Sequence, residues 1–308
     1  MERALVIFNP RARRGAAARS YGRVRAAVEA GFHVREAVLD TTGEWRRAFD
    51  RARREGVDRV VAVGGDGTVH AVANAILADG TGPWRGVTLG AVGVGSSNDF
   101  HKPCRTRVRG IPVRIGVPAA RDAGLASWED SRGVRRTRWF FVSGSLGLCA
   151  RANRRFSRER GVAPWLGARS VDAAIAVSAA GALIDHANVR ARLRGSADEP
   201  ERDVHLSNLG VMLTPYLAGS FRYGTDVQVG QGSFALHLCE GMTRLGLVHA
   251  MTELLRGRFG RAPWMTSWSS RSVSVELEHE DDLELDGELF RARSVLFETV
   301  PHALSVCS

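Results

Sequence analysis

The most obvious shortage in this chain of 308 residues is lysine, because Lys102 is the only one among 43 basic residues. Cysteine is also scarce, and Cys104, Cys149, Cys239 and Cys307 lie far apart with no CxxC spacing. We therefore expect neither a disulfide framework nor a zinc site, and a reducing cytoplasm fits this cysteine usage. No stretch approaches the roughly 18–20 uninterrupted apolar residues that a membrane-spanning helix requires.

Acidic residues are fewer than basic ones, 33 against 43, which gives a formal net charge of +10. An excess of this size is typical of proteins that bind nucleic acid, an anionic membrane surface or a phosphorylated ligand. The sequence contains no recognition-helix motif, no RNP motif and no basic stripe interleaved with aromatic residues. We therefore expect no nucleic-acid partner, and we expect peripheral contact with an anionic membrane. The composition leaves the oligomeric state open.

The first hundred residues alternate between short β-branched runs and helical stretches. Strands are expected over Ala4–Phe8, Val34–Leu39, Arg59–Val63 and Val87–Val92, and helices over Ala17–Ala30, Glu44–Glu55 and Val69–Leu77. Such alternation predicts βαβ units and a parallel, doubly wound α/β sheet. Continuous apolar runs such as Val60–Val63 suit strands that are covered on both faces.

The pattern changes after about residue 110. A polar segment over residues 121–136 is interpreted as a connection, and short apolar runs follow it up to residue 277. These runs predict a second, mainly antiparallel domain with a β-sandwich architecture. The boundaries are expected at residues 1–135 for the first domain and 136–290 for the second.

A glycine-rich loop, Gly64-Gly65-Asp66-Gly67-Thr68, follows an expected strand and opens a helix. Glycine lets the backbone turn sharply and brings N–H groups against a phosphate, and the positive end of the helix favours an anion there. Asp66 in such a loop would accept a hydrogen bond or help to hold Mg²⁺. The alternative is a tight strand–helix turn in which Asp66 is only a cap.

Two other strand ends carry polar residues that point to the same chemistry. Asn9 and the basic turn containing Arg14 follow the first strand, and Ser96, Asn98 and Asp99 follow the fourth. The carboxyl ends of parallel strands share one edge of the sheet, so these side chains and the glycine loop are expected to face one crevice. Their alternatives are a solvated basic turn and a helix cap.

A further candidate site lies near the end of the sequence at Asp286-Gly287-Glu288. An Asp-Gly pair between alternating apolar residues is a hairpin signal in its own right. In the functional interpretation, Asp286 is a general base for a substrate hydroxyl and Glu288 assists it, because phosphoryl transfer needs a positioned alcohol and a carboxylate that takes its proton.

Together these motifs resemble the diacylglycerol kinase catalytic-domain family, which includes bacterial diacylglycerol kinases, YegS-like lipid kinases, and sphingosine and ceramide kinases. The matching segments are Asn9–Gly15, Gly64–Thr68, Ser96–Phe100 and Asp286–Glu288, in the family's order and rough spacing. The resemblance implies a nucleotide-binding α/β domain and a β-sandwich substrate domain, with the final segment, residues 291–308, returning to the first domain. It also implies that ATP lies between the two domains.

The same resemblance implies roles for individual residues. Asp286 would be the catalytic base, and Asp66 and Asp99 would organise Mg²⁺-ATP. The remaining nucleotide-binding candidates are Asn9, Arg14, Thr41, Thr42, Gly64, Gly65, Gly67, Thr68, Ser96 and Asn98.

The chain departs from the family pattern at several positions. His70-Ala71 replaces the usual Asn-Glu after the glycine loop, Ser96 stands where threonine is usual, and Cys149 replaces an acid. The expected function is ATP- and Mg²⁺-dependent phosphorylation of a hydroxyl on a diacylglycerol-like or sphingoid-like lipid. Two alternatives remain: a kinase related to NAD kinase or phosphofructokinase, and a non-catalytic nucleotide- or lipid-binding protein on the same fold.

Overall fold

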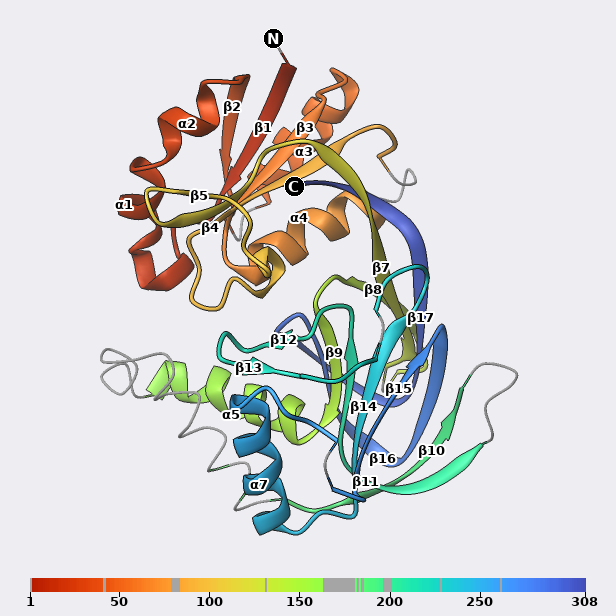
Figure 1. Ribbon diagram of the computed structural model, residues 1–308. Coiled ribbons are helices and arrows are strands. Elements are labelled where there is room, and N and C mark those ends of the chain that lie inside the picture. Colours follow the sequence, from red (N-terminus) through yellow and green to blue (C-terminus); the bar gives the residue numbers. More distant parts are fainter. Residues whose placement is uncertain are drawn as a thin grey trace. The chain divides into compact units, whose positions relative to one another are not determined.

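The computed structural model describes residues 2–40, 43–78, 84–130, 132–162, 181, 183, 186–195, 201–227, 229–260 and 262–308 (Figure 1). The chain divides into two compact units. Unit 1 comprises Met1–Asp122 and His302–Ser308, and unit 2 comprises Ala123–Pro301. The sequence prediction placed the first boundary later, at residue 135, and the return of the chain earlier, at residue 291. In the described part of the chain, no helix combines the length and hydrophobicity needed to cross a membrane.

Unit 1 is built on a parallel sheet with the strand order β2-β1-β3-β4. Its elements are β1 Glu2–Phe8, η1 Ala12–Gly15, α1 Ala17–Gly22, α2 Arg25–Glu29, β2 Phe32–Val38, α3 Glu44–Arg54, β3 Arg59–Gly64, α4 Asp66–Ala78, β4 Thr88–Gly93, η2 Asp99–His101, β5 Arg107–Val108 and β6 Ile111–Arg114. The single helix expected over residues 17–30 is two short helices, α1 and α2.

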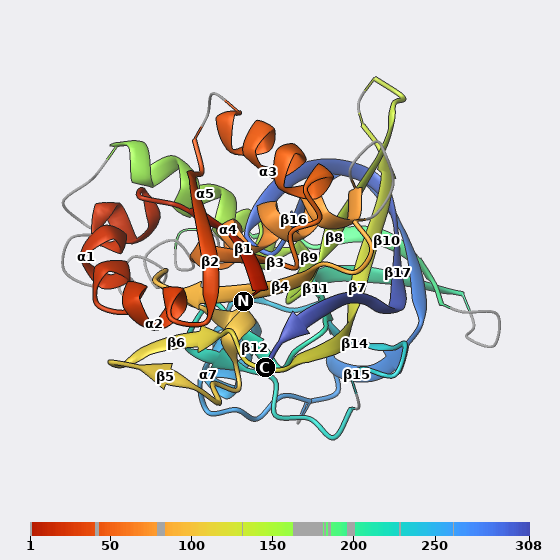
Figure 2. The same cartoon turned by 90° about the horizontal axis from the view of Figure 1, so that it is seen from above.

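Helices cover both faces of the unit 1 sheet (Figure 2). Val61 and Val63 on β3 belong to one buried cluster with Tyr21 and Val28, which come from α1 and α2. Because side chains alternate along a strand, Val60 and Ala62 point to the opposite face, which α3 and α4 cover. This is the doubly wound arrangement that the alternating sequence predicts, and it brings the carboxyl ends of β1, β3 and β4 to one edge.

Unit 2 is a mainly antiparallel assembly. Its elements are β8 Arg135–Phe140, β9 Ser143–Gly147, α5 Leu148–Val162, β10 Val189–Arg194, β11 Arg202–Met212, β12 Tyr216–Leu217, β13 Phe221–Arg222, β14 Phe234–Glu240, α7 Arg244–Leu255, β15 Met265–Ser270 and β16 Ser272–Leu285. Two long strands, β7 Pro118–Glu129 and β17 Glu288–Cys307, run through the boundary between the units.

Strands β11 and β16 each pair with two different strands along their length. Strand β10 pairs with the first half of both, whereas β9 pairs with the second half of both. A register shift occurs in each strand between these halves, at residues 206–208 and 276–281. The shared interior is an apolar core that includes Leu146, Leu209 and Phe297.

One prediction for this region is wrong. Residues 121–136 were interpreted as a connection, but most of them form β7 and the start of β8, which pair from Gly124↔Phe140 to Glu129↔Arg135. The polar side chains of β8 are compatible with a strand because Arg135 and Arg136 are exposed. Gly124 permits the pairing, since a Cβ at this position would lie 2.0 Å from the Phe140 ring.

Candidate active site

The first part of the candidate site lies in unit 1, where the ends of β1, β3 and β4 are joined by backbone hydrogen bonds. The N–H of Asn9 donates to the carbonyl of Val63 at 2.9 Å, and the N–H of Val94 donates to the carbonyl of Gly64 at 2.9 Å. The three strand ends predicted from the sequence therefore meet at one edge of the sheet.

Asn9 and Thr68 are brought together at this edge. The Nδ2 of Asn9 donates to Oγ1 of Thr68 at 2.9 Å, and Thr68 is buried. Gly64 makes this contact possible, because a Cβ on Gly64 would lie 2.1 Å from Oγ1 of Thr68. The glycine is thus required by the packing of the loop on its own helix.

The two glycine-rich loops also touch each other. A Cβ on Gly95 would lie 2.3 Å from the Cα of Gly65, and a Cβ on Gly65 would lie 3.1 Å from the Cα of Gly95. Real Cβ atoms are not found at 2.3 Å from another atom to which they are not bonded, so Gly95 at least must lack a side chain. The sequence interpretation explained Gly65 by the approach of a phosphate. The structure adds a second reason, the packing of one loop against the other.

Asp66 and Asn98 hold the loops in place from either side. Helix α4 begins at Asp66, whose Oδ1 accepts the N–H of Phe100 at 2.9 Å. Asn98 adopts a left-handed backbone with φ of 51°, and its Oδ1 accepts the N–H of Gly95 at 3.0 Å. Gly67 and Ser96 are exposed beside these contacts. A carboxylate in the first turn of a helix is favoured by the helix dipole.

Asp99 has a cation as its immediate neighbour. Its Oδ1 lies 2.6 Å from Nζ of Lys102, and the Asp99 side chain is almost fully buried. Within the described residues, no group of three or more His, Cys, Asp or Glu side chains could hold a metal ion. The two acids at this edge, Asp66 and Asp99, therefore do not belong to a larger carboxylate cluster within the described residues.

His101 is a site neighbour that the sequence analysis missed. It is buried, neither ring nitrogen has a hydrogen-bond partner in the described part of the chain, and a Cβ on Gly93 would lie 2.9 Å from its Cδ2. Burial first, and then the positive charges of Arg114, Arg121 and Arg107, lower the pKa of His101 to about 3. The ring is therefore neutral at physiological pH.

The arginines around His101 also gather at Phe100. The Cζ of Arg121 lies 4.4 Å from the centre of the Phe100 ring, and that of Arg114 lies at 5.9 Å. Burial lowers the pKa of Arg114, and Arg105 adds to this effect. Arginines that lower one another's proton affinity form a site that favours anions.

Three nucleotide-site predictions cannot be placed in this geometry. Thr41 and Thr42 lie outside the described residues. Arg14 lies in η1, next to the end of β1, but its side chain is not among those described.

The second part of the candidate site lies in unit 2, at the turn between β16 and β17. Asp286 and Gly287 have φ values of 49° and 92°, and they close a two-residue hairpin in which Leu285 pairs with Glu288. The hairpin signal read from the sequence is therefore confirmed, because both central residues adopt the left-handed backbone that such turns require. Glu288 is exposed.

The carboxylate of Asp286 binds three consecutive backbone N–H groups. Its Oδ2 accepts from Phe141 at 2.8 Å, and its Oδ1 accepts from Val142 at 2.8 Å and Ser143 at 3.0 Å. The N–H of Asp286 donates in turn to the carbonyl of Ser143 at 2.8 Å. Asp286 thus joins the bend between β8 and β9 to the β16–β17 turn.

Glu284 is a second buried acid at this turn, and the sequence analysis did not single it out. Its carboxylate accepts from Oγ of Ser145 at 2.7 Å and from the N–H of Gly287. Burial raises the pKa of Glu284 to about 7, the charge of Asp286 adds to the rise, and the two hydrogen bonds oppose it. Burial, helped by Glu284, also raises the pKa of Cys149 to about 12.

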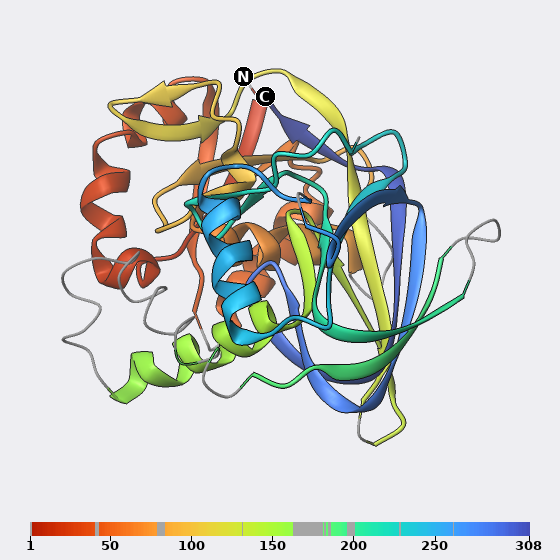
Figure 3. The same ribbon diagram turned by 60° about the horizontal axis from the view of Figure 1, so that its bottom comes forward.

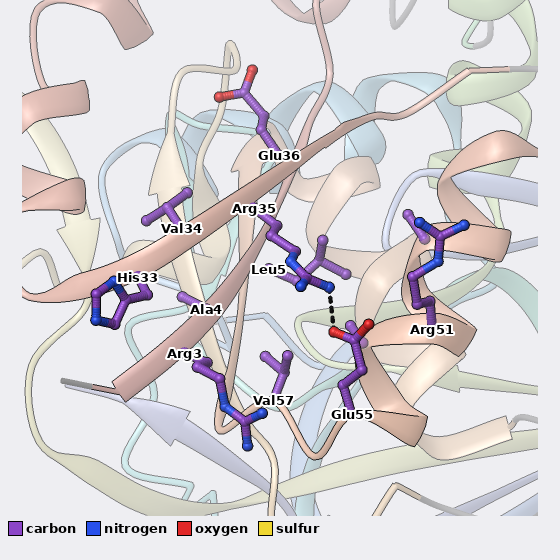
Figure 4. Close-up of a pocket in the computed structure, with 12 residues that line it drawn as sticks. Arg3, Ala4, Leu5, His33, Val34, Arg35, Glu36, Arg51, Glu55 and Val57 are labelled. Atoms are coloured by element: carbon purple, nitrogen blue, oxygen red, sulfur yellow. Dashed lines mark hydrogen bonds and ion pairs between the residues drawn. The ribbon is translucent and has the colours of Figure 1, made fainter.

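A groove of about 550 Å³ lies elsewhere on unit 1, between β1, β2 and α3 (Figure 4). Its floor includes Leu5 and Val57, and an ion pair between Arg35 and Glu55 crosses it. The lining residues of β1 and β2 are residues 3–5 and 33–36, whereas Asn9 and the glycine loops follow the carboxyl ends of their strands. The groove is therefore separate from the glycine-loop site.

Comparison with known proteins gives a consistent result. Residues 3–115 match the family model of the diacylglycerol kinase catalytic domain. A diacylglycerol kinase from Staphylococcus carnosus (strain TM300) is 24% identical over 292 residues, which cover 93% of this chain and 89% of that protein. A protein named "Probable lipid kinase YegS" from Salmonella newport (strain SL254) is 34% identical over 97 residues, or 31% of this chain and 27% of that protein.

A solved structure extends this similarity to the fold. The crystal structure of a diacylglycerol kinase from Bacillus anthracis strain Sterne has a TM-score of 0.68 and 15% sequence identity, and it covers 99% of this chain and 96% of that chain. The expected combination of an α/β domain and a mainly antiparallel β domain is confirmed, as is the resemblance on which it was based.

The contact between the glycine loops predicts a selective effect of Gly95→Ala. The new methyl group must push Gly65 away, so we expect the free energy of unfolding to fall by about 1–3 kcal/mol. Gly22→Ala is the matched control, because a Cβ there meets nothing within 4 Å. Thermal unfolding of both variants measures the difference, and equal melting temperatures for the two would contradict the loop contact.

The environment of Glu284 predicts a pH-dependent effect of Glu284→Gln. The pKa of Glu284 rises from its ordinary value of 4.5 to about 7 in the folded chain. The folded chain therefore binds the proton more tightly, and the contribution of Glu284 to stability is present below about pH 4.5 and is lost as the pH rises through 7. Glutamine keeps the shape without the charge. The free energy of unfolding of the variant should therefore exceed that of the wild type by an amount that grows from pH 5 and reaches about 3 kcal/mol at pH 8.

Urea unfolding of both proteins at several pH values measures this gain. Glu276→Gln is the control, because Glu276 lies on the same strand but is exposed. Stability curves of Glu284→Gln and the wild type that run parallel across this range would rule out a buried, titrating Glu284.

Proposed function

We propose that the chain is a lipid kinase that transfers the γ-phosphoryl group of ATP to a hydroxyl of a diacylglycerol-like or sphingoid-like lipid, which is supported by the match of residues 3–115 to the family model of the diacylglycerol kinase catalytic domain. The observation that carries the proposal is the contact between the Gly64–Thr68 and Gly93–Asp99 loops at the start of α4. Curated relatives of the chain are named as diacylglycerol and lipid kinases.

The geometry suits the phosphates of a nucleotide. Gly65 and Gly67 leave backbone N–H groups accessible at the positive end of α4, which favours an anion. Arg114 and Arg121 add positive charge beside the second loop. We assign Asn9, Thr68, Ser96 and Asn98 to nucleotide binding, and we retain Arg14, Thr41 and Thr42 as predictions.

Asp66 and Asp99 fit a magnesium ion that binds together with the nucleotide. Mg²⁺ keeps several waters and is usually held by one or two carboxylates plus phosphate oxygens, so a cluster of three acids is not needed. When bound, Mg²⁺ would neutralise the charge on the phosphates. Lys102 lies 2.6 Å from Asp99 and would hold that carboxylate in place.

We assign the role of general base to Asp286, with Glu288 assisting. Three backbone N–H groups fix the Asp286 carboxylate, so no further side-chain entropy would be lost when a hydroxyl binds to it. Glu284 is a second candidate, because a pKa of about 7 is matched to proton transfer near neutral pH. Its burial and its two hydrogen bonds make it the weaker one.

The acceptor is found by direct labelling. The protein is incubated with radiolabelled ATP, Mg²⁺ and a panel of diacylglycerols, sphingoid bases, ceramides and prenols, and the lipids are then extracted. Label in one of these lipids supports the proposal. Nucleotide binding without transfer to any lipid would favour a non-catalytic binding protein, and label in a soluble nucleotide would favour an NAD kinase relative.

Asp286→Asn tests the general base. General-base assistance is worth about 10²- to 10⁴-fold in rate, so turnover should fall by this factor while ATP binding persists. The structure adds that the variant is also destabilised, since an amide NH₂ would face a backbone N–H, at a cost of about 1–3 kcal/mol. Turnover must therefore be measured per folded molecule, well below the melting temperature.

Asp282→Asn is the matched control for this experiment. Like Asp286, Asp282 is a buried aspartate, but it lies within β16 and forms ion pairs with Arg154 and Arg291. The control should lose stability but keep its turnover per folded molecule. A fall of less than about tenfold would be smaller than the low end of the expected range. If folded Asp286→Asn retains more than about a tenth of wild-type turnover, Asp286 is therefore a turn residue and not the base.

A further inference from the structure

Large apolar side chains that remain exposed are concentrated around one helix of unit 2. In the described residues, seven large hydrophobic side chains are exposed, and four of them lie between residues 245 and 264. These are Leu245 at 83%, Val248 at 47%, Leu255 at 58% and Trp264 at 44% exposed. The first three belong to α7, and Trp264 immediately precedes β15.

The three residues of α7 lie on one side of the helix. Val248 comes three residues after Leu245, and Leu255 comes seven residues after Val248. Both spacings keep side chains on one stripe of an α-helix. The opposite side of the helix is buried through Leu247 and Leu254, in a cluster with residues of β14 and β15. Helix α7 therefore has two apolar sides, and in the described residues only one of them belongs to a buried cluster. The course of the helix can be followed in Figure 3.

A side-chain cap and the packing of the buried side fix this orientation of the helix. Thr243 caps its start, with Oγ1 accepting the N–H of Gly246 at 3.2 Å. The exposed side is therefore a preformed surface, and we define the docking face as Leu245, Val248 and Leu255. Exposed apolar side chains that gather on one side of a helix are typical of an interaction site.

The charges around the docking face favour an anionic partner. Between residues 244 and 258 there are three arginines, Arg244, Arg256 and Arg258, and a single acid, Glu253. Arg256 and Arg258 both approach the same oxygen of Glu253, at 3.3 and 3.4 Å, so their charges are not fully balanced. Arg244 adds a cation at the other end of the helix.

We propose that the docking face of α7 inserts into the surface of an anionic lipid bilayer. Exposed apolar side chains on one side of a helix and arginines near both of its ends are features that hold a helix in a membrane interface. The inference rests on the proposed function in one respect, because a kinase whose acceptor is a lipid must work at a bilayer. It goes beyond that function in naming the surface that makes the contact.

Co-sedimentation of the full chain with vesicles tests the proposal. The vesicles contain phosphatidylcholine alone or phosphatidylcholine with about one-third phosphatidylglycerol. Binding should be stronger to the anionic vesicles and should weaken with salt. The double variant Leu245→Ser/Leu255→Ser should lower the partition coefficient at least about tenfold, because two apolar side chains no longer enter the bilayer. Arg244→Gln should weaken only the preference for anionic vesicles, by about fivefold.

Val134→Ser is the matched control. Val134 is an exposed apolar residue of the same unit, at 45%, but it lies in the turn between β7 and β8. This variant should bind vesicles as the wild type does. Turnover on a short-chain diacylglycerol dispersed without a bilayer should be the same in all the variants, since none of these residues belongs to the candidate active site.

The outcomes separate this proposal from the proposed function. Two results would overturn the proposal that the docking face inserts into an anionic bilayer. One is vesicle binding of the double variant that is as strong as that of the wild type. The other is binding of the wild type that is equally strong to neutral and anionic vesicles. A wild-type dimer that becomes a monomer in the double variant, with vesicle binding unchanged, would also overturn it and assign the face to a second copy of the chain. Vesicle binding that depends on α7, in a protein with no kinase activity, would leave the docking face standing and reject the proposed function.

Discussion

The contact between Gly65 and Gly95 is the constraint on which the unit 1 site depends. The two loops belong to neighbouring parallel strands, β3 and β4, and they can meet because Gly95 carries no Cβ at the point of contact. Once they meet, the carboxylate of Asp66 reaches the N–H of Phe100 and α4 starts beside the second loop. A phosphate-sized anion at the start of α4 would then be within reach of both loops.

Much of this arrangement could be predicted from the sequence, and the reason is general. A parallel sheet brings its carboxyl ends to one edge, so three polar strand ends had to become neighbours once the βαβ pattern was recognised. The pairing of Gly65 with Gly95 could not be predicted in the same way, because it depends on the register between β3 and β4. His101 was missed for a related reason: nothing in its local sequence indicates that it is buried beneath Gly93.

The candidate site in unit 2 was harder to predict because the burial and hydrogen bonds of its residues depend on partners far away in the sequence. Glu284 alternates with Leu283 and Leu285, and such alternation ordinarily places the acid in solvent. It is buried instead, because β9 pairs with this end of β16 and Ser145 comes to lie against it. Asp286 was recognised as a turn residue and as a candidate base. Its three bonds to residues 141–143 bridge a separation of more than 140 residues and leave no local signal.

The return of the chain to unit 1 has a consequence for how the protein is made. Residues 302–308 complete unit 1: Ser305 and Val306 pair with Thr88 and Leu89 of β4, and the N–H of His302 donates to Asp122, 180 residues earlier. During synthesis the N-terminal segment therefore emerges from the ribosome without its last strand and must wait for all of unit 2 to be translated. An expression fragment that stops at residue 122 would keep β6 paired with the second half of β4 but would leave Thr88 and Leu89 without their partners, and exposed sheet edges promote aggregation.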